Sequence, residues 1–243
     1  MTDRSPKPPS IKRLTERLKV RAGLTRYSAV EFLIALVLLL VVTPFVEGLN
    51  QAELLEGVLL TVVLCSAVLA VGAEPRTLKI AVALSIPAVV AKWANHFAPA
   101  LIPAEVFLLP GMAFVVFVIF QLLRFILSAS RVNTEVLCAG IATYLTFGLL
   151  WTFAYVLTAR VTPNAFSVAG IAGSKVLSGF DALYFSYVTL CTVGFGDITP
   201  TSPVSRMLAV LEALTGTIYL AVLVARLVSM YSVSGLPTQT DNS

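Results

Sequence analysis

Long uncharged runs of apolar residues alternate with short polar segments along most of this chain. A helix needs about 20 predominantly apolar residues to cross the hydrocarbon core of a bilayer, so each run of that length predicts a membrane-spanning helix. The pattern therefore predicts an all-α membrane protein with six transmembrane helices. The predicted spans are 29–46, 57–73, 78–95, 106–128, 133–159 and 204–230.

The third predicted span is the weakest of the six. Lys79 and Lys92 bracket only twelve uncharged residues, and Pro87 interrupts them. This helix must therefore recruit flanking residues, or the Lys92 ammonium group must extend to the membrane surface.

Basic residues predict the orientation of the spans. Of the 17 Lys and Arg residues, eight lie in the first 26 positions, directly before the first apolar run. This block should hold the N-terminus in the cytoplasm, and six spans then return the C-terminus to the same side. The inner loops then contain Arg76, Lys79, Arg124 and Arg131, as the positive-inside rule requires. The predicted location is the cell membrane (plasma or inner membrane), multi-pass, with both termini cytoplasmic.

The basic N-terminal segment has two interpretations. Within residues 11–27, Ile11, Leu14 and Leu18 share one helical face, which suits a short helix on the anionic lipids of the inner leaflet. Alternatively, the segment is a solvated tail that only sets the topology. No nucleic-acid partner is expected, because no recognition fold accompanies the basic residues.

Composition agrees with a membrane protein and excludes other classes. Hydrophobic residues make up 58% of the chain and charged residues 12%, against about 25% charged residues in soluble domains. Cys65, Cys138 and Cys191 stand singly, the first two in apolar runs and the third between the last two spans, and His96 is the only histidine, so no Cys and His metal site is expected. No metalloprotease helix, nucleophile elbow or phosphate-binding loop is present, so we expect no enzyme and no cofactor.

The segment between the last two spans differs from an ordinary loop. Residues 160–179 are rich in Gly, Ala and Ser and are predicted to form an extracellular loop. Ser178 and Asp181 have the spacing of a capping signal, which predicts a short helix over about 181–191. Residues 192–200 are then non-helical backbone at membrane depth, which is tolerated only where it is buried in protein or lines a watery cavity.

This non-helical segment has the chemistry of a cation site. A dehydrated K⁺ ion needs a cage of oxygens, which backbone carbonyls from four copies of one strand can supply in stacked rings. Gly194 and Gly196 permit the backbone angles that aim successive carbonyls at one axis. The C-terminal end of the short helix carries partial negative charge, which also favours a cation. The predicted K⁺-coordinating residues are Thr192, Val193, Gly194 and Phe195, with Val193 and Phe195 packing outward, and Gly196 and Asp197 shape the outer mouth.

Residues 181–185 (DALYF) and 189–197 (TLCTVGFGD) resemble the pore helix and selectivity filter of tetrameric potassium channels. The resemblance covers about residues 133–230 and implies a homotetramer with K⁺ as the transported ion. It also implies that Pro200 closes the filter loop and that Arg206 opens the inner helix. Gly216 falls at that family's inner-helix hinge. Spacing from Gly216 makes Thr217, Leu220 and Val224 candidates for the lining of the cavity.

The sequence departs from the commoner pattern of that family at four positions. Phe195 replaces a tyrosine, Cys191 a frequent threonine, and Tyr184 and Phe185 two tryptophans. A hydroxyl that ties the filter to its surroundings is therefore missing. A hydrogen bond between Asp197 and the Tyr184 hydroxyl would provide a substitute.

Two other features suggest regulation. Glu212 lies inside the sixth span and is expected to be either a structural brace toward the pore helix or a titrating gate. Arg124 and Arg131 lie at the membrane edge and lack the repeated spacing of a voltage sensor, so lipid anchoring is expected instead.

The resemblance divides the chain into four parts and leaves two alternative functions open. The parts are a basic cytoplasmic segment (1–28), a four-helix transmembrane module (29–130), a pore domain (131–232) and a disordered cytoplasmic tail (233–243).

One alternative function is a weakly selective cation channel, which Phe195 suggests. The other, a potassium-transporter subunit, is less favoured because related transporters carry four degenerate filter loops in one chain, and this chain has one intact copy.

Overall fold

The computed structural model describes residues 29–46, 52–71, 75–97, 105–169 and 177–234. The predictions for the basic segment 1–28 and for residues 235–243 of the tail lie outside these ranges. The prediction for residues 170–176, which are part of the loop, also lies outside them.

Six helices of the described residues are long and apolar enough to cross a membrane, which confirms the predicted all-α membrane protein. The first predicted span matches its helix, and the other boundaries differ by a few residues. The weak third span is a continuous helix of 23 residues through Pro87, because it recruits residues on both sides. The six are α2 (Ala29–Val46), α3 (Ala52–Val71), α4 (Pro75–Phe97), α5 (Glu105–Ser128), α6 (Thr134–Val161) and α8 (Pro203–Ser234).

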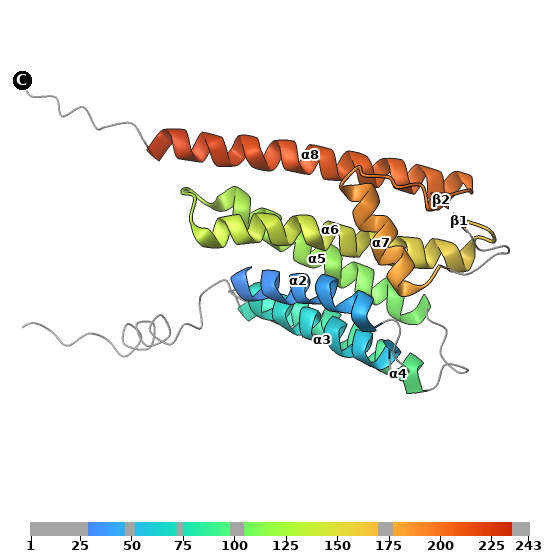
Figure 1. Cartoon of the computed structure of the whole chain (residues 1–243). Helices are drawn as coiled ribbons and strands as arrows, with labels where there is room; N and C mark the ends of the chain where they lie inside the picture. Colours follow the sequence, from blue (N-terminus) through green and yellow to red (C-terminus); the bar gives the residue numbers. More distant parts are fainter. Residues whose placement is uncertain (1–28, 47–51, 72–74, 98–104, 170–176, 235–243) are drawn as a thin grey trace, which may run out of the picture.

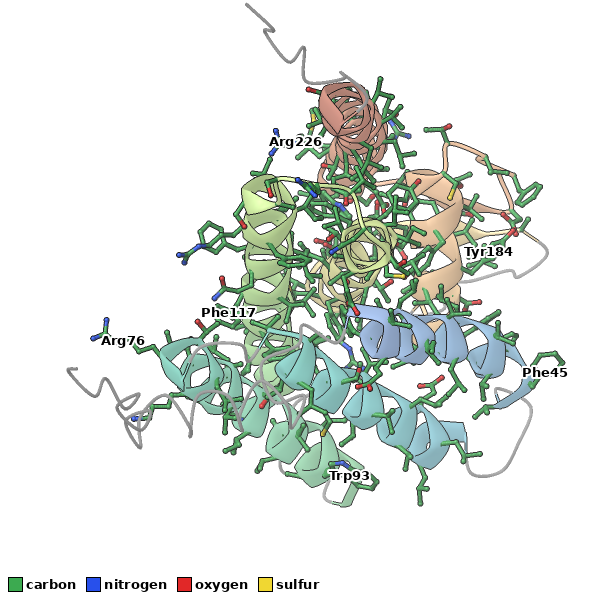
Figure 2. All side chains as sticks on the ribbon, turned by 90° about the vertical axis from the view of Figure 1, so that its left-hand side faces the viewer. Phe45, Arg76, Trp93, Phe117, Tyr184 and Arg226 are labelled. Carbon is green, nitrogen blue, oxygen red and sulfur yellow. The ribbon has the colours of Figure 1, made fainter. Side chains whose placement is uncertain are left out.

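Helix α6 is the centre of the packing. It contacts α2 and α5 on one side and α7 (Gly179–Leu190) and α8 on the other. One hydrophobic core joins the four leading helices with α6. Figure 1 shows α8 at one edge of the molecule and α3 and α4 at the opposite edge, and Figure 2 shows the same order end-on. Most of the four leading helices therefore lie away from α8, and the end of α5 is the part that contacts it.

Helix α7 lies between α6 and α8 and is too short to cross a membrane. Its 12 residues span about 18 Å, against a hydrocarbon core of about 30 Å. A capping box begins it: Ser178 Oγ accepts from the Asp181 amide at 3.0 Å, and the Ser178 amide donates to Asp181 Oδ2 at 3.4 Å. This confirms the predicted capping signal, although the helix begins two residues earlier than expected.

Two short strands flank α7 and were not predicted. β1 (Phe166–Val168) pairs antiparallel with β2 (Ile198–Pro200), with Ser167 opposite Thr199. Residues 160–179 were expected to form a loop throughout, and that expectation is wrong for β1. Three residues are too few to show an alternating pattern, and this pairing depends on a partner about 30 residues away.

Arg226 joins the C-terminal half of α8 to the end of α5. Its Nη2 donates to the carbonyls of Leu127 at 3.0 Å and Ala129 at 3.2 Å. The last carbonyls of a helix lack partners in the helix and carry partial negative charge, so a guanidinium satisfies both needs. Figure 2 shows Arg226 between α8 and this end of α5.

Replacing Arg226 with Met should lower the stability of the solubilised protein. The change keeps an apolar stem but removes both hydrogen bonds, so the free energy of unfolding should fall by about 1–2 kcal/mol. Thermal unfolding followed by circular dichroism in detergent measures the loss. Arg124→Met, which alters an exposed arginine on α5, is the control. Equal melting temperatures for the two variants would contradict this role of Arg226.

Candidate functional site

The chain after α7 folds back against the C-terminal end of that helix. The Thr192 amide donates to the Thr189 carbonyl at 2.9 Å, and the Val193 amide donates to the Val188 carbonyl at 2.9 Å. The Gly194 amide approaches the same Val188 oxygen at 3.4 Å. The inner half of the predicted filter is therefore fixed by the helix end, where the helix dipole is negative.

Every second residue of the predicted filter has a positive φ. The values are 57° at Thr192, 56° at Gly194 and 82° at Gly196. Alternation of the sign of φ turns successive carbonyls toward one side, whereas an ordinary strand alternates them. The glycines behave as expected. The positive φ of Thr192 was missed, because a β-branched residue in this region is an outlier and nothing in the sequence signals it.

Asp197 anchors the outer end of the filter. The Tyr184 hydroxyl lies close enough to its carboxylate for the two groups to interact, and the brace itself remains a prediction. Its Oδ1 also accepts from the Ile198 amide at 3.0 Å, and its carbonyl accepts from the Ala169 amide at 2.7 Å. Tyr184 lies on α7, outside the six spans, and the interaction with Asp197 followed by burial raises the pKa of its hydroxyl. The hydroxyl therefore remains a donor at neutral pH.

Gly216 lies inside the uninterrupted helix α8 and contacts the end of α7. A Cβ at this position would lie 2.5 Å from the Leu190 carbonyl oxygen and 3.0 Å from Leu190 Cδ1. Glycine therefore lets the backbone of α8 approach that of α7. The hinge role remains a prediction. The close approach of the two helices was not predicted, because the sequence shows only a glycine within a long apolar helix.

The three candidates for the cavity lining share one face of α8. Thr217, Leu220 and Val224 are all exposed in a single chain, and Thr217 Oγ1 donates to the Ala213 carbonyl at 2.9 Å. The side chains of α8 are mostly uncovered. Within its apolar span 11% is buried, against 56% within the span of α6. The structure therefore leaves this face available to other molecules.

The predicted filter is also uncovered in a single chain. Residues 192–197 are all exposed, including 53% of Val193 and 70% of Phe195. The two side chains were expected to pack outward, and within one chain they are not covered. The described part of the chain supplies no surface over them, and it also holds no cluster of three His, Cys, Asp or Glu residues suited to a metal ion.

Glu212 is fully buried beside α7. Ser186 Oγ donates to its Oε1 at 2.6 Å, and the Tyr155 hydroxyl donates to its Oε2. The structure thus places this carboxyl group against α7, the predicted pore helix. Its two partners were missed, because hydroxyl residues in apolar helices usually bond to their own backbone and give no signal of a distant partner.

Comparison with known families gives a match at the C-terminal part of the chain. The sequence model of a family described as an ion channel matches residues 135–233. This segment contains α7, the predicted filter and all but one residue each of α6 and α8. No solved structure matches the chain significantly.

Several curated proteins are similar over shorter segments. Two-pore potassium channel 5 of Arabidopsis thaliana is 37% identical over 73 residues, which cover 30% of this chain and 18% of that protein. A voltage-gated potassium channel of Aeropyrum pernix is 36% identical over 58 residues, 24% of this chain and 20% of that protein. Protein LctB of Geobacillus stearothermophilus is 44% identical over 62 residues, 26% of this chain and 46% of that protein. The chain therefore spans less than half of the length of each of these relatives.

Proposed function

We propose that this chain belongs, through residues 135–233, to the potassium channel family and that four copies form a channel that passes K⁺ passively across the cell membrane. The observation that carries the proposal is the positive φ at every second residue of the segment after α7. Rings of carbonyls from such a segment replace the water that a K⁺ ion loses, as described for potassium channel filters.

Each residue of the filter has a proposed part in conduction. The oxygens of Thr192, Val193, Gly194 and Phe195 coordinate K⁺. Gly196 and Asp197 shape the outer mouth, and Tyr184 braces Asp197 through its hydroxyl. The hydrogen bonds from the filter amides to α7 support this assignment, because they leave the carbonyls as the free polar edge of the segment.

A homotetramer is proposed because one chain holds a single copy of the filter. The exposure of residues 192–197, together with the uncovered face of α8, indicates surfaces that other copies would cover. In this assembly Thr217, Leu220 and Val224 line the cavity below the filter, and Gly216 serves both as the contact with α7 and as the hinge of the inner helix.

The remaining parts are proposed to surround this pore. Residues 131–232 form the pore domain and residues 29–130 a module on its side away from α8. Both termini are cytoplasmic, and the basic segment 1–28 lies near anionic lipids of the inner leaflet. Because Phe195 lacks the hydroxyl of the commoner filter, a weakly selective cation channel is the second candidate function.

Reversal potentials test the proposal. With K⁺ on one side of a planar bilayer and Na⁺ on the other, the purified protein should reverse close to the K⁺ equilibrium potential. Native mass measurement in mild detergent should give four chains of 26.0 kDa. A clear current that reverses near zero would favour the weakly selective channel. Monomers as the sole species would overturn the tetramer.

A further inference from the structure

Glu212 is the one acidic or basic residue among the buried residues of the described chain. It has no exposed surface, although it lies within a membrane-spanning helix. Placing a carboxyl group in such a site is costly unless partners compensate it, so its contacts are expected to have a purpose.

Three helices meet at this side chain. Ser186 on α7 donates to Oε1 at 2.6 Å, and Tyr155 on α6 donates to Oε2, while Glu212 itself belongs to α8. Both partners are also fully buried, so water does not compete for either bond. Ser186 Oγ lies in addition 2.8 Å from the Gly148 carbonyl of α6.

Proton counting shows that the three helices stay joined in either charge state of Glu212. Ser186 has one proton and two acceptors, the Gly148 carbonyl and Glu212 Oε1. A carboxylate accepts this proton. A neutral carboxyl group instead donates to Ser186 Oγ, and Ser186 then donates to the Gly148 carbonyl. A glutamine amide can take the same role as the neutral carboxyl group.

The position of Ser186 determines the position of the filter. Ser186 lies two residues before Val188, whose carbonyl accepts from the Val193 and Gly194 amides. The other partner is held rigidly, because the Tyr155 ring packs against Phe185 of α7, with ring centroids 4.9 Å apart, and is also in contact with the ring of Phe166. A shift at Ser186 therefore moves the backbone that bears the predicted carbonyl rings.

We propose that Glu212 is a positioning residue for ion selectivity: by bridging Tyr155 and Ser186 it fixes α7 between α6 and α8 and thereby sets the carbonyl positions of the filter. This inference rests on the proposed function. It names two hydroxyl groups as the partners of the brace. It also predicts a measurable effect of the brace on the selectivity between K⁺ and Na⁺.

The test uses the reversal potential of the full chain under K⁺ and Na⁺ gradients. The reversal potential does not depend on how many channels fold, so a loss of stability alone lowers the current and leaves this potential unchanged. Glu212→Leu removes both hydrogen bonds, and Tyr155→Phe and Ser186→Ala remove one each. Glu212→Gln is the conservative variant that keeps both contacts.

Tyr219→Phe is the matched control. The Tyr219 hydroxyl also joins α8 to α6, at 2.7 Å from the Gly140 carbonyl, but it makes no bond to α7. The Tyr219→Phe variant therefore loses a buried tyrosine hydrogen bond, as the Tyr155→Phe variant does. Its K⁺/Na⁺ permeability ratio should therefore equal that of the unmodified protein.

Glu212→Leu should lower the permeability ratio at least about tenfold, because the buried Tyr155 hydroxyl loses its acceptor and Ser186 keeps only the Gly148 carbonyl, so that this site no longer joins α8 to α7. A tenfold change shifts the reversal potential by about 59 mV, since tenfold is about 1.4 kcal/mol and 100 mV is about 2.3 kcal/mol per charge. Tyr155→Phe and Ser186→Ala should each lower the ratio at least about threefold, and Glu212→Gln should stay within about threefold. In the double variant, Ser186→Ala should lower the permeability ratio little beyond the effect of Glu212→Leu, because both changes remove the bond between Ser186 and Glu212.

The proposed function and the positioning role of Glu212 would fail in distinguishable ways. An unmodified protein without K⁺ selectivity would overturn the proposed function itself. A selective unmodified protein whose Tyr155→Phe and Ser186→Ala variants keep its permeability ratio would overturn the positioning role, even where Glu212→Leu yields no current. A ratio that falls equally in Tyr219→Phe would overturn it as well.

Discussion

Gly194→Ala channels are expected to lose most of their preference for K⁺ over Na⁺. Gly194 has a φ of 56°, and no heavy atom lies within 4 Å of an added Cβ, so the effect is conformational and not steric. An L-residue in the left-handed region costs about 1–2 kcal/mol, and the cost is incurred four times around one pore. The alanine relieves this strain by rotating its peptide plane, which turns a carbonyl away from the proposed ion path.

The permeability ratio of Gly194→Ala, taken from the reversal potential, measures this effect and should fall to near one. Gly179→Ala is the control for the chemical change itself. Gly179 is the first residue of α7, and an added Cβ would meet only Glu56 Oε2, at 3.6 Å. A wild-type ratio in Gly194→Ala would show that the positive φ is not needed for selectivity.

Gly216→Ala should destabilise the protein, although alanine is the better helix former. Ordinary contact requires about 3.4 Å or more, so a Cβ 2.5 Å from the Leu190 carbonyl oxygen forces α8 and the end of α7 apart by roughly an ångström. Such overpacking costs about 1–3 kcal/mol, which exceeds the gain of about 1 kcal/mol in helix propensity. The displaced carbonyl belongs to Leu190, two residues before the predicted filter, so K⁺ current should also fall.

Thermal unfolding in detergent and bilayer current test Gly216→Ala together. Gly111→Ala, whose Cβ would meet the Phe153 ring at an ordinary 3.7 Å, should be neutral or stabilising. A glycine that served only as a hinge would give a more stable Gly216→Ala protein with altered opening. A higher melting temperature for Gly216→Ala would therefore contradict the close-contact role.

The sequence predicted those features that depend on neighbouring residues. The length and hydrophobicity of each run predicted the six membrane helices, and the Ser178 and Asp181 spacing predicted the start of α7. The two filter glycines were expected to adopt unusual backbone angles, and both have a positive φ. Such features follow from the period of a helix, from local capping or from the missing Cβ of glycine.

Features that join distant segments could not be predicted in the same way. The bonds from Arg226 to the end of α5 span almost 100 residues, and Glu212 meets Tyr155 57 positions away. Neither arginine nor glutamate in an apolar helix indicates which of several neighbouring helices it faces. The contact between Gly216 and Leu190 likewise depends on how closely two helices approach, and a single sequence does not contain that distance.

The pairing of β1 with β2 has a consequence for the entropy of the segment between them. The strands close a loop that begins at Val168 and ends at Ile198, and the bond from the Ala169 amide to the Asp197 carbonyl extends this closure by one step. At the other end, the amides of Thr192, Val193 and Gly194 are already bonded to α7. Only two residues, Phe195 and Gly196, lie between these two attachments. Folding has therefore already removed most of their conformational freedom, and an ion that binds there orders the backbone at little further entropic cost.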